Sequence, residues 1–372
     1  AALVLHALAL LAKTSTVILP VVLVVVDVWP FARVRRLGWK RVLVEKVPFV
    51  LLSFAMGLVA IRGQGQVNHV MVSWHDHPLG ARLVQEGFTA FFFAYKTFAP
   101  SKLLPLYPLP PASAFFTAPI LLPALGACAV TLAALALARR WPAFSAAWIT
   151  FLAGLVLTGG IFQAGPQIVA DRYSYLACWP LALLVAGLVL LSPLAHRAPR
   201  EIGLGLLTAA SIALVVLTSL QSARWRDSRS LWEYTWELTP DSALAASNLA
   251  NVRMIDSSRT EDPDVRKALL EQARDLHLEA FKLGGQARSL LNVGETLQTL
   301  ADLEPDPARW TAAKEGALEV VERAIDLGTE TGELLPGWYG TRGSLLLQLG
   351  RAQAALPDLE RLVAGLPDDI QG

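Results

Sequence analysis

Apolar runs long enough to cross a lipid bilayer recur through the first 220 residues of the chain. The hydrocarbon core of a bilayer is about 30 Å thick, so roughly 20 consecutive apolar residues in a helix can span it. We count seven hydrophobic segments, the first of them partial, at 1–12, 14–30, 47–61, 117–138, 143–161, 174–191 and 203–220. Charged residues make up only 17% of the chain, against about 25% in an average soluble domain. The pattern predicts a multispanning helical membrane domain and argues against an ordinary soluble enzyme.

The net charge of +1 conceals two halves of opposite sign. Residues 1–220 contain 16 Lys and Arg against 6 Asp and Glu, a net +10. Residues 221–372 contain 16 Lys and Arg against 25 Asp and Glu, a net −9. We therefore expect a transmembrane domain at 1–220, a juxtamembrane linker with half a repeat at 221–240, and a separate repeat domain at 241–372.

Basic residues in the short loops predict the orientation of this membrane domain, because cytoplasmic loops are enriched in Lys and Arg. The loops after the second, fourth and sixth apolar runs hold ten basic residues, within 33–46, 139–140 and 197–200. If these loops face inward, everything after residue 220 lies on the outer side. The outer loops before residue 220 then hold six cations: Lys13, Arg62, Arg82, Lys96, Lys102 and Arg172.

The segment at 79–98 cannot be a single span in this orientation, because residues 62–116 must begin and end outside. The pattern is typical of a helix that lies at the membrane interface or re-enters it. Its polar residues fall near one helical face: Arg82, Glu86, Thr89 and Lys96.

We expect no metal site and no disulfide framework. Cys128 and Cys178 both lie in apolar runs, which does not suit a thiolate zinc site. The outer loop before residue 79 contains imidazole and carboxylate groups whose spacing matches no metal-binding motif. We therefore interpret it as a loop that faces solvent or a bound acceptor molecule. These groups are His69, His75, Asp76 and His77.

The acidic half follows the 34-residue pattern of the tetratricopeptide repeat, a helix–turn–helix unit with small residues where its helices touch. The last unit fits without a gap, although Leu362 replaces one small residue. Its matching positions are Gly343, Gly350, Ala355, Leu359 and Pro367. The pattern predicts an α-solenoid whose concave groove binds a protein or peptide.

Two earlier units match the same pattern with eleven extra residues each between their helices. The first has Ala250, Ala273, His277 and Ala280, and the second has Gly294, Ala317, Val321 and Ala324. Because the extra residues include Pro263, Pro305 and Pro307, we interpret them as longer turns. A preceding half repeat is marked by Ser228, Trp232 and Pro240.

Several local sequences resemble one protein family, in order and across essentially the whole chain. They are LLAKTSTVILPVVLVVVDVWP, LVEKVPFVLLSFAMGLVAI, PLGARL, IVADRYSYL and WRDSRSLWEYTWELTPDSALAASNLAN. They resemble the bacterial relatives of the transmembrane and tetratricopeptide-repeat O-mannosyltransferases. The most specific part is ADRYSYL followed by WRDS and the repeats.

This resemblance implies a GT-C class membrane glycosyltransferase in a bacterial inner membrane, with its repeats in the periplasm. Such an enzyme transfers a sugar, mannose in the named family, from a polyprenyl-phosphate carrier to a protein acceptor held by the repeats. No metal, other cofactor or nucleic acid is implied. The family's catalytic carboxylates lie in its first outer loop, so we expect them upstream of Ala1 and interpret the sequence as truncated at its N-terminus.

Cations on the outer side are the candidates for binding the donor phosphate. Arg172 is the first candidate, because a planar guanidinium group suits phosphate oxygens. A cation in the first turn of a helix also opposes the helix dipole, so something other than helix stability should favour Arg172 there. Pairing with Asp171 or snorkelling toward lipid headgroups would also explain Arg172. Asp171 is either a helix N-cap or a functional group, and Tyr173 is either an interface residue or a supporting one. Further phosphate candidates are Lys13, Lys96 and Arg82.

The alternative to an enzyme is a non-catalytic membrane-anchored scaffold, whose repeats recruit partners for envelope assembly. An acidic residue in the upstream outer loop would favour the enzyme. A transporter is disfavoured because the centres of the spans carry few ionisable residues.

Overall fold

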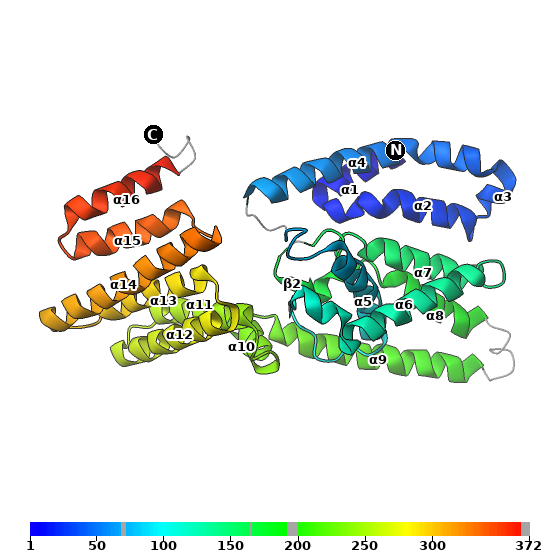
Figure 1. The fold of residues 1–372 in the computed structure, drawn as a ribbon. Helices are drawn as coiled ribbons and strands as arrows, with labels where there is room; N and C mark the ends of the chain where they lie inside the picture. The colour runs from blue at the N-terminus through cyan, green and yellow to red at the C-terminus, as the bar shows by residue number, and fades with distance from the viewer. Residues whose placement is uncertain (68–71, 164, 192–199, 366–372) are drawn as a thin grey trace. The chain divides into compact units, whose positions relative to one another are not determined.

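The computed structural model is almost entirely helical and confirms the predicted all-α class (Figure 1). It describes residues 1–67, 72–163, 165–191 and 200–365. Two compact units make up the chain, Ala1–Ser219 and Leu220–Gly372. In the described parts the only sheet is an antiparallel ribbon of β1 (Tyr107–Pro108) and β2 (Gln167–Val169).

Every apolar run of the first unit contains a helix. In chain order the helices are α1 (Ala2–Ala12), α2 (Leu19–Val28), α3 (Arg33–Leu37), α4 (Trp39–Val67), α5 (Leu79–Phe98), α6 (Ala118–Ala136), α7 (Pro142–Leu155), α8 (Trp179–Leu191) and α9 (Arg200–Arg224), the last of which continues into the second unit. Three short 3₁₀ helices join them: η1 (Thr14–Ile18), η2 (Ala112–Phe116) and η3 (Asp171–Tyr173).

Three helices among the described residues are long and apolar enough to cross a membrane: Trp39–Ala60, Ala118–Ala136 and Glu201–Arg224. The other four apolar runs form shorter helices, Ala2–Ala12, Thr14–Val28, Pro142–Leu155 and Trp179–Val189. The run at 143–161 yields a short helix because the chain leaves α7 at Leu155 and then turns against α5.

Helix α5 forms at the expected residues, but its polar face is turned inward. Arg82, Gln85 and Thr89 are at most 1% exposed. Phe91 and Phe98 on the other side are 41% and 64% exposed. The amphipathic pattern is therefore not that of a helix with a solvated polar face, because Arg82 and Gln85 find hydrogen-bond partners in the segment after α7.

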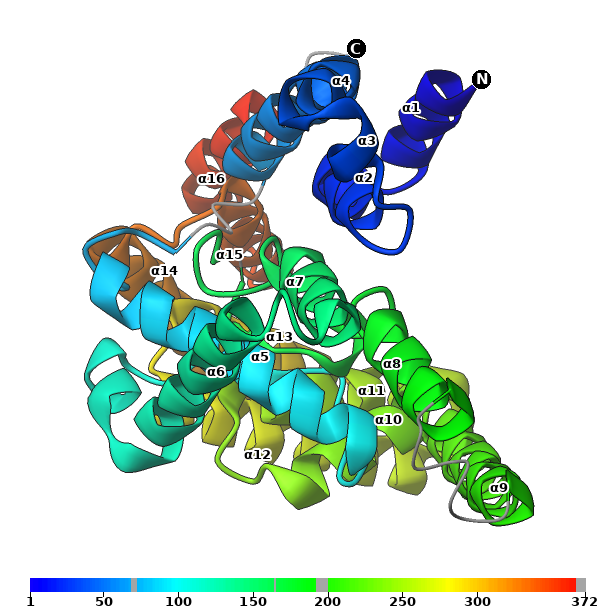
Figure 2. The ribbon, with the colours of Figure 1, turned by 90° about the vertical axis from the view of Figure 1, so that its right-hand side faces the viewer.

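The core of the first unit forms where α5, α6, α7 and α8 pack together (Figure 2). Its largest enclosed side chains are aromatic: Phe93, Phe115, Trp148 and Phe151. The ribbon of β1 and β2 adds Val169 to this core, so the chain segments that follow α5 and α7 are held on one packed support.

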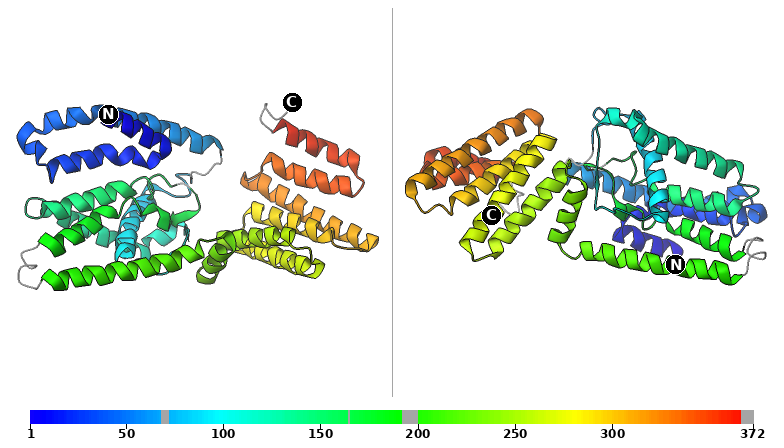
Figure 3. Two further views of the ribbon diagram at one scale, coloured as in Figure 1. Left: turned by 180° about the vertical axis from the view of Figure 1, so that it is seen from behind. Right: turned by 90° about the horizontal axis from the view of Figure 1, so that it is seen from below.

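Successive helices lie side by side in the second unit (Figure 3). They are α10 (Ser228–Leu238), α11 (Ala243–Arg259), α12 (Pro263–Gly284), α13 (Ala287–Ala301), α14 (Pro307–Thr331), α15 (Pro336–Gln348) and α16 (Ala352–Ala364). Each helix packs on the one that follows it, and α13 also contacts α15, so most contacts of this stack are local in sequence.

Most of the small residues singled out by the sequence pattern are buried where these helices meet, whereas Gly350 is exposed in the turn between α15 and α16. A Cβ atom added at Gly294 would lie 2.5 Å from Cγ2 of Val321, and one at Gly343 would lie 3.1 Å from Cδ2 of Leu359. The absence of a side chain at these positions allows α13 to approach α14 and α15 to approach α16. The fully buried alanines of the pattern are Ala250, Ala273, Ala280, Ala317, Ala324 and Ala355.

The eleven extra residues of the two earlier units lengthen the helices, so their interpretation as longer turns is wrong. Only residues 260–262 separate α11 from α12, and Pro263 is the first residue of α12. The carboxyl group of Asp262 caps this end by accepting backbone N–H groups. Pro307 opens α14 in the same way. Proline is tolerated at the first helical position because its missing N–H would have no partner there.

We expect Gly294→Ala to destabilise the second unit by about 1–3 kcal/mol, because the added methyl group overlaps Val321. The matched control is Gly316→Ala on α14, where a Cβ meets no atom within 4 Å. That change should stabilise the unit by up to about 1 kcal/mol, since Ala is the better helix former. Pulse proteolysis in urea, with cleavage scored within the second unit, measures both changes, and equal effects would contradict the close approach of α13 and α14.

His277 on α12 is fully enclosed by this helix stack. Neither of its ring nitrogens has a hydrogen-bond partner among the described residues. Burial lowers the pKa of this imidazole from 6.5 to about 4, because the charged form cannot be hydrated there. The folded unit therefore holds a neutral imidazole at pH values where the unfolded chain binds a proton.

Acidification should therefore weaken the second unit between pH 6.5 and pH 4. Because the folded pKa of His277 is the lower one, stability is lost as the pH falls through the unfolded value. The loss at pH 5 relative to pH 7 is about 2 kcal/mol. Pulse proteolysis at the two pH values should show this loss in the wild type and a smaller one in His277→Leu. An identical pH dependence of the two proteins would refute the assignment to His277.

Candidate functional site

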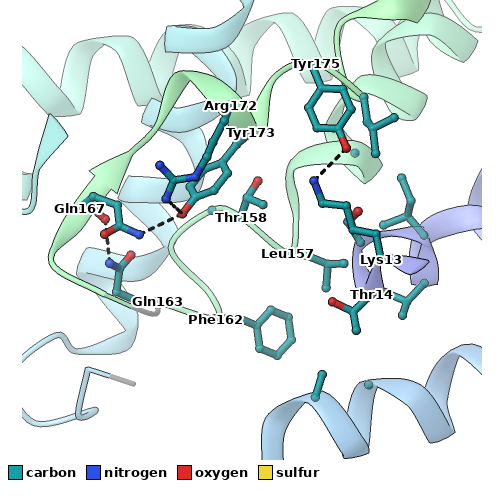
Figure 4. Close-up of a pocket in the computed structure, with 18 residues that line it drawn as sticks. Lys13, Thr14, Leu157, Thr158, Phe162, Gln163, Gln167, Arg172, Tyr173 and Tyr175 are labelled. Atoms are coloured by element: carbon teal, nitrogen blue, oxygen red, sulfur yellow. Dashed lines mark hydrogen bonds between the residues drawn. The ribbon is translucent and has the colours of Figure 1, made fainter. Parts of the chain in front are cut away.

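A cavity of about 440 Å³ lies in the first unit, between η1, α4, the turn after α7 and the segment around η3 (Figure 4). Two cations line it, Lys13 and Arg172, although they are far apart in the sequence. Several apolar side chains complete its walls: Val17, Ile18, Leu157, Phe162 and Leu176. The cavity thus offers positive charge beside an apolar surface.

Lys13 enters the cavity from the junction between α1 and η1. Its backbone is extended there, and its carbonyl accepts a hydrogen bond of 2.9 Å from the hydroxyl of Thr16. The ammonium group donates to the Tyr175 hydroxyl over 2.8 Å (Figure 4). Because an ammonium group has three donors, two hydrogens of Lys13 remain to bind a ligand. The hydroxyl of Ser15 also lines the cavity and has no hydrogen-bond partner among the described residues.

Arg172 reaches the cavity from η3. Its Nη1 donates to the carbonyl of Pro105 over 2.8 Å, and its Cζ lies 5.0 Å from the centre of the Tyr173 ring. Its Nη2 also donates to the Tyr173 hydroxyl over 3.5 Å. The residue is otherwise exposed, so the remaining N–H groups of its guanidinium can bind an anion. The alternative that Arg172 pairs with Asp171 is wrong, because no ion pair joins them among the described residues.

A chain of amide side chains supports the Arg172 end of the cavity. His77 hydrogen-bonds Gln85 over 2.7 Å, and Gln85 donates to the Gln163 side chain over 2.7 Å. Gln163 donates to the backbone carbonyl of Gln167, whose side chain donates to the Tyr173 hydroxyl over 2.9 Å. Tyr173 therefore holds a defined position beside Arg172.

Sequence reasoning alone missed the three glutamines of this chain. The available signal was an amide group in otherwise apolar surroundings, at Gln85 on α5 and at Gln163 and Gln167 in the link before ADRYSY. Buried amides need hydrogen-bond partners, so such positions point to a built polar network.

Asp171 holds the proline-rich segment rather than a helix end. Ala170 is the N-cap of η3, so the interpretation of Asp171 as an N-cap is wrong. Its carboxylate accepts the backbone N–H of Leu104 over 2.5 Å and lies within hydrogen-bond distance of the Tyr107 hydroxyl. Burial raises the pKa of this carboxyl to about 6, although the N–H group, the charge of Lys96 and the hydroxyl favour its charged form.

Lys96 lies outside the cavity. Its ammonium group donates to the backbone carbonyl of Ser101, where the proline-rich segment begins. Burial lowers its pKa, and the nearby Asp171 charge opposes that shift. Lys96 therefore serves, with Asp171, to attach the segment that carries Pro105.

Arg82 is enclosed on α5 and also lies outside the cavity. Its guanidinium group donates to the carbonyls of His77 and Val72 over 2.7 Å each and of Ile161 over 3.1 Å. Longer bonds reach Ser73 and Gly160. With only 1% of its surface exposed, Arg82 organises two loops and offers no free donor to a phosphate.

Glu86 supports the same turn one helical turn further along α5. The backbone N–H groups of Gly160 and Ile161 donate to its carboxyl, whose pKa burial raises to about 7. A Cβ atom at Gly159 would overlap this carboxyl, and one at Gly160 would overlap the Arg82 carbonyl. The turn that lines the cavity can therefore contact α5 this closely only because both residues are glycines.

No group of three His, Cys, Asp or Glu side chains in the described parts of the chain is arranged to hold a metal ion. Asp76 accepts a hydrogen bond from Ser73, and His77 is buried, with a pKa that burial lowers. His75 is exposed, and His69 lies outside the described residues.

No protein-family model matches the chain, and no curated protein matches it either. The function therefore has to be inferred from the residues of the cavity and from the sequence patterns.

Arg82→Lys should destabilise the first unit by about 2–3 kcal/mol, because an ammonium group cannot replace the planar fork that satisfies several buried carbonyls. Thermal unfolding of the detergent-solubilised chain measures the change. Arg139→Lys, at an exposed turn, is the matched control and should leave the melting temperature unchanged. Equal melting temperatures of Arg82→Lys and the control would contradict this role.

Proposed function

We propose that the chain is part of a GT-C type membrane glycosyltransferase that takes a sugar, mannose by family resemblance, from a polyprenyl-phosphate carrier. The observation that carries this proposal is the cavity in which Lys13 and Arg172 meet apolar side chains. A lipid-linked sugar has the matching parts, an anionic phosphate and a long apolar chain. The sequence resemblance, whose most specific string contains Arg172, points to the same substrate.

The phosphate would contact Lys13 and Arg172, and the first isoprene units would lie against Phe162, Leu157 and Ile18. Cations in a partly desolvated site bind a phosphate more strongly than cations in open water. Tyr175 and Tyr173 hold the two cations in place. Arg82 and Lys96 are not among the proposed phosphate contacts, because both donate to backbone carbonyls outside the cavity.

The three helices of spanning length support a place in a membrane. The basic inner loops favour the orientation in which the cavity segments and the second unit face outward. In a bacterial inner membrane this side is the periplasm. A carrier lipid could then enter the cavity from the bilayer without losing its apolar surroundings.

The second unit would hold the protein acceptor as a tetratricopeptide solenoid. The close approach at Gly294 and Gly343 and the buried alanines support this class, because such repeats pack through small residues. Stacked helix pairs of this kind present an extended surface suited to a peptide.

In the proposed transfer, the acceptor hydroxyl oxygen forms a bond to the anomeric carbon while the bond from that carbon to the carrier phosphate breaks. The hydroxyl proton passes to a carboxylate of the family's first outer loop, which the resemblance implies. The leaving carrier phosphate keeps the electron pair, and Lys13 and Arg172 stabilise its added negative charge.

The binding part of this proposal is testable on the present chain with undecaprenyl phosphate as the probe. Native mass spectrometry of the detergent-solubilised protein should show a bound lipid. Arg172→Gln and Lys13→Gln should each weaken binding about tenfold, through the loss of one charge-assisted contact. Lys102→Gln removes an exposed cation outside the cavity and should leave the affinity unchanged.

Wild-type affinity in both cavity variants would remove this site from the proposal. Complete absence of binding by the wild type would favour the scaffold. Transfer of labelled sugar by the full-length protein then tests the enzyme itself, and Arg172→Gln should lower the rate at limiting donor.

A further inference from the structure

A second cavity, of about 630 Å³, lies wholly within the second unit, between the start of α10 and the end of α11. Three arginines line it: Arg226 and Arg229 near the start of α10, and Arg259 at the end of α11. The proposed transferase mechanism uses none of them. We call this feature the arginine groove.

The charges of the arginine groove do not cancel. Arg229 pairs with Asp256 over 2.7 Å, so this charge is compensated. Asp227 caps α10 by accepting the backbone N–H of Ser230 over 2.8 Å, and it also lies 3.5 Å from Arg226. Arg259 has no ion-pair partner among the described residues. The groove therefore keeps one uncompensated guanidinium, and the Arg226 side chain remains 80% exposed.

The arginine groove follows directly on a helix of spanning length. The apolar segment of α9 ends at Arg224, and Arg226 is two residues later. Two residues of extended chain reach at most about 7 Å, so Arg226 stays close to the end of the apolar segment. Trp225 between them is 44% exposed, and exposed tryptophans beside basic residues are typical of the headgroup layer of a membrane.

The wall of the arginine groove on α11 also carries two apolar residues. Val252 and Ile255 line it beside Asp256 and Arg259, and Ile255 is 49% exposed. A small soluble anion would gain nothing from these side chains. A phospholipid headgroup would, because its glycerol and first acyl carbons accompany its phosphate.

We propose that the arginine groove binds the phosphate headgroup of an anionic phospholipid from the membrane that α9 crosses. Arg226 and Arg259 bind the phosphate oxygens, Trp225 lies in the headgroup layer, and Ile255 contacts the glycerol end of the acyl chains. This contact ties the first helices of the second unit to the bilayer surface. The proposal rests on the membrane placement of α9 and not on the transferase activity.

Hydrogen–deuterium exchange of the full chain in lipid nanodiscs tests this assignment. One set of discs contains phosphatidylcholine alone, and the other contains phosphatidylcholine with phosphatidylglycerol. The backbone amides in the first turn of α10 should exchange about fivefold more slowly in the anionic discs, since a basic residue near an anionic surface contributes about 1 kcal/mol. The double variant Arg226→Gln/Arg259→Gln should lose this difference.

The matched control is Arg309→Gln/Arg323→Gln, which removes two exposed arginines elsewhere in the second unit and should keep the difference. Equal exchange of the wild type in both kinds of disc would overturn the proposal, as would retained protection in the groove variant or its loss in the control. Equal protection by inorganic phosphate in phosphatidylcholine discs would assign the groove to a soluble anion and would also overturn it. Because none of these readouts involves sugar transfer or the carrier lipid, they are independent of the outcome for the first cavity.

Discussion

The guanidinium group of Arg82 is the contact on which the rest of the first unit depends. It donates to carbonyls before α5 and to carbonyls after α7, two segments that no regular secondary structure joins. Buried carbonyls without donors would cost about 1–3 kcal/mol each, so the loops can pack here only with this side chain present. Gln85 and Glu86 extend the same support to the residues that line the cavity. Arg82, one of the four cations that the sequence offered for a phosphate, is thus a structural group.

The inward polar face of α5 explains how a cavity with free cations persists in an apolar unit. Two loops would otherwise need water to satisfy their backbone groups, and α5 supplies donors and acceptors in its place. The outer face of α5 remains apolar and suits a lipid environment. Lys13 and Arg172 are held by tyrosines and one carbonyl, so part of their hydrogen-bonding capacity stays available to a ligand.

Periodic signals in the sequence were the reliable ones. The apolar runs, the helix at 79–98 and the small residues from Ala250 to Ala355 all lie where the patterns predict them. The direction in which α5 faces was not predictable, because it depends on a turn 78 and 79 residues away that supplies two of the acceptors of Arg82. Pro263 and Pro307 were expected in turns but are the first residues of helices, because proline is common both in turns and at the first helical position. Of the four cations that the sequence offered for the phosphate, Lys13 and Arg172 line the cavity, whereas Arg82 and Lys96 lie outside it. Which of these cations meet is set by tertiary packing alone.

The long helices of the second unit have a geometric consequence. Helix α14 has 25 residues and α16 has 13, a difference of about 18 Å in length at 1.5 Å per residue. Helix α12, with 22 residues, is likewise longer than both helices of the last pair, which have 13 residues each. If the second unit binds a polypeptide as we propose, the length of each helix would shape the path of that chain, separately from the side chains that contact it.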